Sequence, residues 1–163
     1  MEIERLEFTV YCTPTPQGSS KGFPIRRPNG KMGVVITSDN AKLKPFRHVV
    51  AQAATVAVLE AGGICPVADK HVPVMLELDF YFAKPSSMAK KRIFPVVKPD
   101  IDKLARSAFD SLTGILFADD AQVVDVRLRK HYGYPERIEV KMRLAATEAV
   151  SDIHAGQPNL VAV

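Results

Sequence analysis

The spacing of apolar residues changes between residues 101 and 128, and this change constrains the fold more than any other feature of the chain. From Ile101 to Leu112 the apolar residues follow the period of a helix with one buried face. From Gln122 onward they alternate with charged residues, which predicts a half-buried strand. A helix followed directly by a strand is typical of a domain in which helices cover a sheet.

Four aspartates frame this helix and strand: Asp100, Asp102, Asp119 and Asp120. Pro99 disfavours helix at the residue before it and Asp100 is a favourable N-cap, so we expect the helix to begin at about Ile101 and to stop at Gly114. The polar residues Asp102, Lys103, Arg106, Ser107 and Asp110 are expected on its solvent side.

The aspartates suggest a metal site, but a simpler interpretation is open. With Asp100 outside the helix and Asp102 in its first turn, both carboxylates can lean toward the same space. A third carboxylate from the start of the strand, at Asp119 or Asp120, would complete an oxygen-rich site suited to Mg²⁺. Aspartates at these positions are also ordinary cap and turn residues. Spacing alone leaves both interpretations open.

Composition excludes several classes of protein. At 163 residues, with 47% hydrophobic and 25% charged residues, the chain fits one soluble globular domain. No apolar run approaches ~20 residues, so no membrane span is expected, and the acidic N-terminus does not resemble a signal peptide. Two isolated cysteines and four scattered histidines argue against zinc and favour a reducing cytoplasm.

Positive charge is unevenly distributed. Residues 21–47 contain seven basic residues and one acid, and residues 84–98 contain five basic residues and no acid. Two such segments suit a polyanionic partner that is contacted through phosphates. A solvated basic surface without a partner is the alternative.

The remaining patterns complete a prediction of fold class. Strands are expected near residues 6–12, 74–82 and 137–144, with a hairpin around Asn29-Gly30 and a helix ending at Ala61. The strand at 74–82 is expected to be the longest and central, and the Gly/Ser-rich residues 17–24 are expected to form a loop. We therefore predict one α+β domain over residues 1–145, with a mixed sheet and two main helices. Residues 146–163 are expected to form a flexible C-terminal tail.

Three blocks of sequence together resemble the RusA family of Holliday junction resolvases, which are endodeoxyribonucleases common in phages and prophages. The blocks are KPDID at 98–102, FDSLTG at 109–114 and FADDAQVV at 117–124. The resemblance extends from about Phe8 to Leu144. It implies a homodimer that binds four-way or other branched DNA and cuts two strands symmetrically with Mg²⁺, or with Mn²⁺ as the alternative ion.

The resemblance also implies roles for particular residues. Asp100, Asp102 and Asp120 match the catalytic, metal-binding carboxylates, and Asp119 is a neighbouring candidate. Where the family generally carries an asparagine and a lysine, this chain has Lys103 and Arg106, and either could supply the catalytic cation. Arginine is a planar fork and a poor proton donor. The residues expected to grip the DNA backbone are Lys21, Arg26, Arg27, Lys31, Lys90, Lys91 and Arg92.

Two other functions compete with the nuclease. The changes at positions 103 and 106 allow a protein of the same fold that binds junctions or branched DNA without cutting them. An Mg²⁺-dependent enzyme for a small phosphorylated substrate is the third hypothesis. The sequence has no Gly-rich phosphate loop at the start of a helix, which such enzymes use, and this argues against the third hypothesis.

Overall fold

The computed structural model describes residues 3–18, 20–38 and 40–145, without the side chains of residues 20–22 and 35–38. Its elements, in chain order, are β1 (Arg5–Val10), β2 (Ser20–Arg26), β3 (Met32–Ser38), α1 (Leu43–Glu60), β4 (Val74–Phe82), α2 (Ile101–Leu112), the short 3₁₀ helix η1 (Asp120–Gln122), β5 (Val123–Tyr132) and β6 (Arg137–Leu144). The tail expected over residues 146–163 lies outside this description, so the domain boundary at residue 145 stays a prediction.

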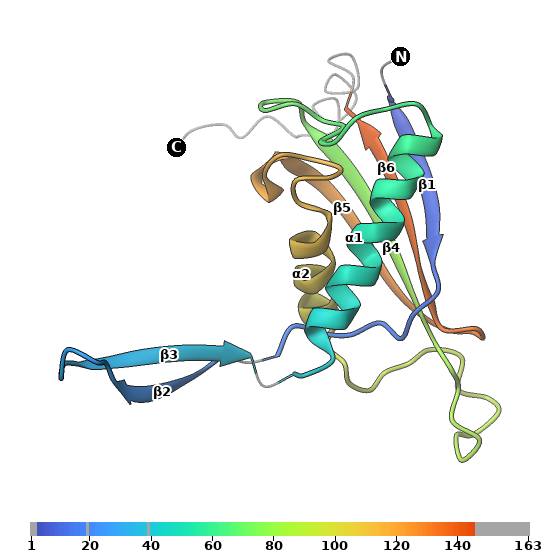
Figure 1. Ribbon diagram of the computed structural model, residues 1–163. Helices are drawn as coiled ribbons and strands as arrows, with labels where there is room; N and C mark the ends of the chain where they lie inside the picture. The colour runs from blue at the N-terminus through green and yellow to red at the C-terminus, as the bar shows by residue number, and fades with distance from the viewer. Residues whose placement is uncertain (1–2, 19, 39, 146–163) are drawn as a thin grey trace, which may run out of the picture.

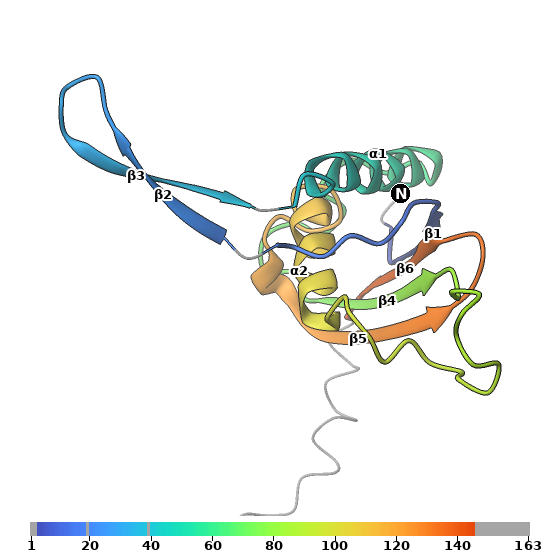
Figure 2. The same cartoon turned by 90° about the horizontal axis from the view of Figure 1, so that it is seen from below.

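Four strands form one twisted sheet in the order β1-β6-β4-β5. β4 and β5 run parallel, whereas β6 is antiparallel to both β1 and β4. Both helices lie on one face of the sheet, and β2 and β3 form a separate ribbon that projects away from it (Figures 1 and 2). The predicted α+β domain with a mixed sheet and two main helices is confirmed.

The core fills the space between the helices and the sheet. The buried residues of α1 recur every three or four positions, as its period predicts: Leu43, Phe46, Val50, Ala54 and Val58. In the sheet, Leu78 of β4 is fully buried and lies between Val140 of β6 and Leu128 of β5. Burying one such leucine contributes about 1.5–3 kcal/mol to the free energy of folding. This burial stabilises the packing of the helices on the sheet.

The sheet differs from the prediction in two respects. β4 is central, as expected, but β5 is longer, with ten residues against nine. The apolar side of β5 that is predicted to be buried is exposed to solvent at the start of the strand, where Val124 and Val126 are 62% and 41% exposed. β5 is an edge strand, and these two residues lie outside the buried core that the helices and sheet share.

The predictions for one residue and one segment were wrong. Ser107, expected on the solvent side of α2, is fully buried, because its hydroxyl donates to the carbonyl oxygen of Thr15 at 2.6 Å. Residues 20–24, expected in a loop, form most of β2, which pairs with β3 across the predicted Asn29-Gly30 turn. Gly30 has a φ of +78°, which glycine adopts without strain.

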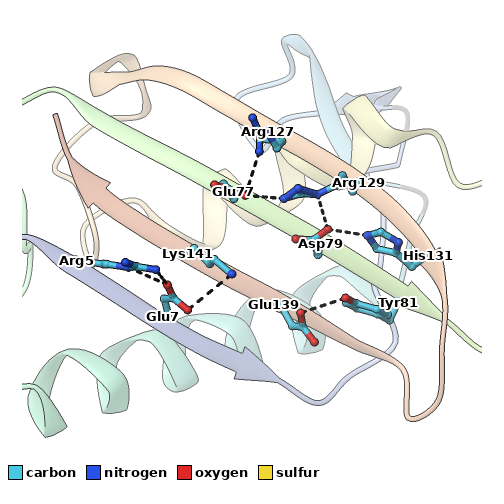
Figure 3. Close-up of polar contacts among 10 residues, drawn as sticks. All are labelled: Arg5, Glu7, Glu77, Asp79, Tyr81, Arg127, Arg129, His131, Glu139 and Lys141. Atoms are coloured by element: carbon cyan, nitrogen blue, oxygen red, sulfur yellow. Dashed lines mark hydrogen bonds and ion pairs between the residues drawn. The ribbon is translucent and has the colours of Figure 1, made fainter. Parts of the chain in front are cut away.

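The face of the sheet opposite the helices carries paired charges (Figure 3). Arg129 bridges Glu77 at 2.5 Å and Asp79 at 2.9 Å, and His131 lies 2.7 Å from Asp79. Hydrogen bonding to Arg129 holds the pKa of Glu77 below its usual value. This face is therefore polar, and its acids and bases balance one another.

None of the helices in the described ranges is long and apolar enough to cross a membrane.

Candidate active site

Asp100 occupies the N-cap position of α2 without capping it. Its backbone is extended, with φ −70° and ψ 140°, and its side chain makes no hydrogen bond to the first turn. The carboxylate instead pairs with the ammonium of Lys103 at 3.0 Å, and 47% of the side chain is exposed. This hydrogen bond, reinforced by the charges of Lys103, Lys98 and Lys130, lowers the pKa of Asp100. Asp100 is therefore an ionised carboxylate directed outward.

Asp102 and Arg106 continue the same exposed side of α2. They are four positions apart in the helix, so they are neighbours on its surface. Both are exposed, and within the described ranges neither side chain makes a hydrogen bond or an ion pair. Lys103 is engaged with Asp100, and that pairing raises the pKa of Lys103. Of the two candidate cations, Arg106 is thus the one without a partner in this part of the chain.

Asp119 and Asp120 lie beyond the C-terminal end of α2, where η1 begins. The Asp119 carboxylate accepts a hydrogen bond from the backbone N–H of Ala121 at 2.9 Å, and the backbone N–H of Asp119 donates to the side-chain oxygen of Gln122 at 2.9 Å, which forms a capping box. Gln122 also donates to the carbonyls of Asp69 and Val72, which anchors η1 at the start of β4. Asp119 is therefore a turn residue, and the side chain of Asp120 is left exposed.

The third carboxylate does not join the other two within one chain. Asp100 begins α2 and Asp120 follows it, so the helix, about 18 Å long at 1.5 Å per residue, separates them (Figure 1). Among the described residues, no group of three or more histidines, cysteines, aspartates or glutamates lies close enough to hold a metal ion. The expectation of a three-aspartate site inside a single chain is not met. Asp100 and Asp102 stay adjacent, and Asp120 lies at the other end of the helix.

The segment before Asp100 is held firmly in place. Lys130 of β5 donates hydrogen bonds to the carbonyl oxygens of Val97 and Pro99, both at 2.8 Å. The segment that follows β1 approaches from the other side, where the backbone N–H of Gln17 donates to the carbonyl of Lys103 at 2.9 Å. Between these segments lies a cavity of about 510 Å³ with Asp100 and Lys103 in its wall.

The two basic segments project on either side of this helix start (Figure 2). Arg26, Arg27 and Lys31 are exposed at the tip of the β2–β3 ribbon, and Lys90, Lys91 and Arg92 are exposed on the loop between β4 and α2. The Lys84 ammonium donates to the carbonyls of Lys90 and Arg92, which orders that loop. Lys21 lies in β2, and its side chain is outside the described residues.

Sequence reasoning missed several contributors to the site. Lys42 and Lys98 line the cavity beside Asp100, and Lys130 fixes the backbone just before it. One signal was available for Lys130, because it occupies a position in β5 where the alternation Val124, Val126, Leu128 calls for an apolar residue. Nothing in the spacing of residues 13–18 indicated that they form a wall of the cavity.

Two comparisons with known proteins show what the chain is similar to. The family described as Endodeoxyribonuclease RusA matches residues 15–143. The chain is also similar to an uncharacterized protein, YqaN, of Bacillus subtilis (strain 168), with 32% identity over 151 residues. That alignment covers 86% of this chain and 97% of the relative.

Replacing Lys103 with methionine should raise the pKa of Asp100 toward its ordinary value of 3.8, because the largest cause of the lowered pKa is the hydrogen bond from Lys103. The measurement is an NMR titration of the Asp100 carboxyl carbon. Lys70→Met, which removes an exposed lysine near the start of β4, should leave this pKa unchanged. An unchanged Asp100 pKa in Lys103→Met would show that the pair does not form in solution.

Proposed function

Because the chain belongs to the RusA family of endodeoxyribonucleases, which are Holliday junction resolvases, we propose that it cuts four-way DNA junctions by paired, symmetric, Mg²⁺-dependent hydrolysis of two phosphodiester bonds. The observation that carries the proposal is the start of α2. Two outward-directed carboxylates, Asp100 and Asp102, lie there between two exposed basic segments. Carboxylates for an ion flanked by cations for phosphates are what a metal-dependent nuclease requires.

The residues at the start of α2 fit a magnesium ion. Mg²⁺ in proteins is commonly held by one or two carboxylates, with substrate phosphate oxygens and waters completing its octahedron. Asp102 is exposed and free of hydrogen bonds within the described ranges, and Asp100 is an exposed carboxylate that pairs with Lys103. When bound, the ion supplies Lewis-acid polarisation of the scissile phosphate and neutralises developing charge.

We further propose that Asp120 completes this site in a second copy of the chain. β5 is an edge strand, so one side of its backbone is available for pairing. Antiparallel pairing of two β5 strands about a two-fold axis would bring the start of one strand, next to Asp120, to the end of the other, next to Lys130 and Asp100. The exposed Val124 and Val126 lie on this strand and would be covered.

The cations of the chain have separate tasks in this proposal. Arg106, one turn beyond Asp102 on the same exposed side, offsets negative charge on the phosphate. Arginine is a poor proton donor, so its role here is electrostatic. Lys103 pairs with the Asp100 carboxylate and orients it. The residues of the ribbon tip and the loop, Arg26, Arg27, Lys31, Lys90, Lys91 and Arg92, together with Lys21, bind the DNA backbone and position it without reading bases.

Removing one cation from the ribbon tip should weaken junction binding most at low salt. In Lys31→Gln, the slope of log K against log salt concentration should decrease in magnitude by about 0.9, the value for one lost phosphate contact. Lys70→Gln is the matched control, because Lys70 is equally exposed but lies near the start of β4, away from the ribbon. Equal slopes for wild type and Lys31→Gln would show that the ribbon tip does not contact the DNA backbone through Lys31.

Mixed dimers test whether each site takes Asp120 from the other chain of the dimer. Chains carrying Asp102→Asn or Asp120→Asn should be inactive alone, because neither homodimer has a complete site. A mixed dimer, co-expressed with two different tags, has one site with both substitutions and one intact site. It should nick a plasmid cruciform to the open circle without producing the linear form that paired cutting gives.

The controls separate this arrangement from its alternatives. If each chain held a complete site, the mixed dimer would be as inactive as the two homodimers. Asp119→Asn should cut like wild type, because asparagine is also a favourable cap. A wild-type protein that binds junctions and cuts none of them with Mg²⁺ would contradict the nuclease proposal itself.

A further inference from the structure

The cavity beside Asp100 has the size and wall of a small-ligand site. Its volume of about 510 Å³ falls within the roughly 300–1,000 Å³ of such pockets. Pro14, Pro16, Pro99 and Phe82 supply apolar surfaces, and Asp100 lies at its edge. A mostly apolar cavity that adjoins a hydrolytic site suits a flat apolar group attached to the substrate.

The wall formed by residues 13–17 is preformed. Ser107 of α2 donates to the carbonyl of Thr15 at 2.6 Å, and the amide side chain of Asn40 donates to the carbonyl of Pro16 at 3.0 Å. The backbone N–H of Gln17 donates to the carbonyl of Lys103. Three bonds to two other segments hold this wall open, so the cavity exists before any ligand arrives.

Charge around the cavity selects an anionic ligand. Lys42, Lys98 and Lys103 all line it, against the single acid Asp100. Lys103 is paired with Asp100, whereas Lys42 and Lys98 are exposed and, within the described ranges, their ammonium groups make no hydrogen bond or ion pair. Two free ammonium groups beside apolar walls match a nucleotide, which joins a phosphate to a flat base.

One polar atom in the wall lacks a partner. The side-chain oxygen of Gln17 is shielded from solvent and accepts no hydrogen bond within the described ranges. Such an atom is costly to leave unpaired. A rotation of the Gln17 side chain would turn its amide toward the cavity, where the hydrogen-bonding edge of a nucleobase offers N–H donors to it.

We infer that this cavity takes one unstacked base of the branched DNA, next to the phosphodiester that is cut, and that Gln17 reads its edge. The inference rests on the proposed nuclease function for the position of the phosphate at Asp100. The base comes from the branch point, because unstacking costs least where the helix is already interrupted. The protein thereby gains a preference for nucleotide sequence that its backbone contacts alone cannot supply.

Fluorescence of 2-aminopurine, which increases when the base leaves the stack, tests the inference without cleavage. Synthetic four-way junctions carry the probe at single positions around the branch and are bound by wild-type protein in EDTA. Fluorescence should rise at one position per symmetric pair of strands. In Gln17→Leu, which keeps the side-chain size and removes the acceptor, the affinity for the unstacked state should fall about two- to ten-fold, the factor of one neutral hydrogen bond.

The same variants are then compared for cutting with Mg²⁺ on junctions that differ only in the base at that position. Wild type should cut the junction with one base faster than the others, and Gln17→Leu should cut all of these junctions at similar rates. Gln52→Leu, the same change at an exposed position of α1, should match wild type in both assays. Thermal unfolding of the variants checks that they are folded.

Each outcome bears on one proposal or on both. Junction binding with no rise in fluorescence at any position, or a Gln17→Leu protein identical to wild type in both assays, would overturn the pocket. A Gln17-dependent rise in fluorescence without cutting would leave the pocket standing and overturn the nuclease proposal. A wild-type protein that binds no junction would overturn both.

Discussion

The parallel pairing of β4 with β5 determines where the chemistry of this protein can occur. Two parallel neighbours require a crossover that returns the chain from the end of one strand to the start of the next, and α2 provides the return. Asp100 precedes the helix and Asp120 follows it, so they must lie at opposite ends of the sheet. A site that needs both residues has to be built from two chains, and the free edge of β5 is the natural place for them to meet.

Charge pairing distinguishes the two sides of the molecule. On the open face of the sheet, the carboxylates of Glu77 and Asp79 pair with Arg127 and Arg129, and this face has little charge left for a polyanion (Figure 3). On the side of the molecule where α2 begins, the cations of the projecting ribbon tip make no ion pair within the described ranges, and those near the cavity are only partly paired. The N-terminal end of a helix adds its own partial positive charge. Free positive charge therefore gathers where the two carboxylates are, which supports DNA binding on that side.

Much of the fold follows from the sequence, because period and caps are local properties. The helix at Ile101–Leu112 and the extended backbone of Asp100 agree with the apolar spacing and with Pro99. The position of Asp120 does not follow from spacing, because it depends on whether β4 and β5 pair in parallel, which is a long-range choice. Ser107 was misplaced for a similar reason: the carbonyl of Thr15, which accepts a hydrogen bond from its buried hydroxyl, lies 92 residues away in sequence.

The most direct test of this account is the position of Asp120 relative to Asp102 across two chains. Chains with Asp102→Cys and chains with Asp120→Cys, both with the exposed Cys65 replaced by serine, are mixed and oxidised. Cys12 is retained, because burial raises the pKa of its thiol to about 11 and keeps it protonated and unreactive. The account predicts a disulfide-linked dimer containing one chain of each kind. No link between the two kinds of chain would contradict it, as would a link within one chain in a third, monomeric variant that carries both substitutions.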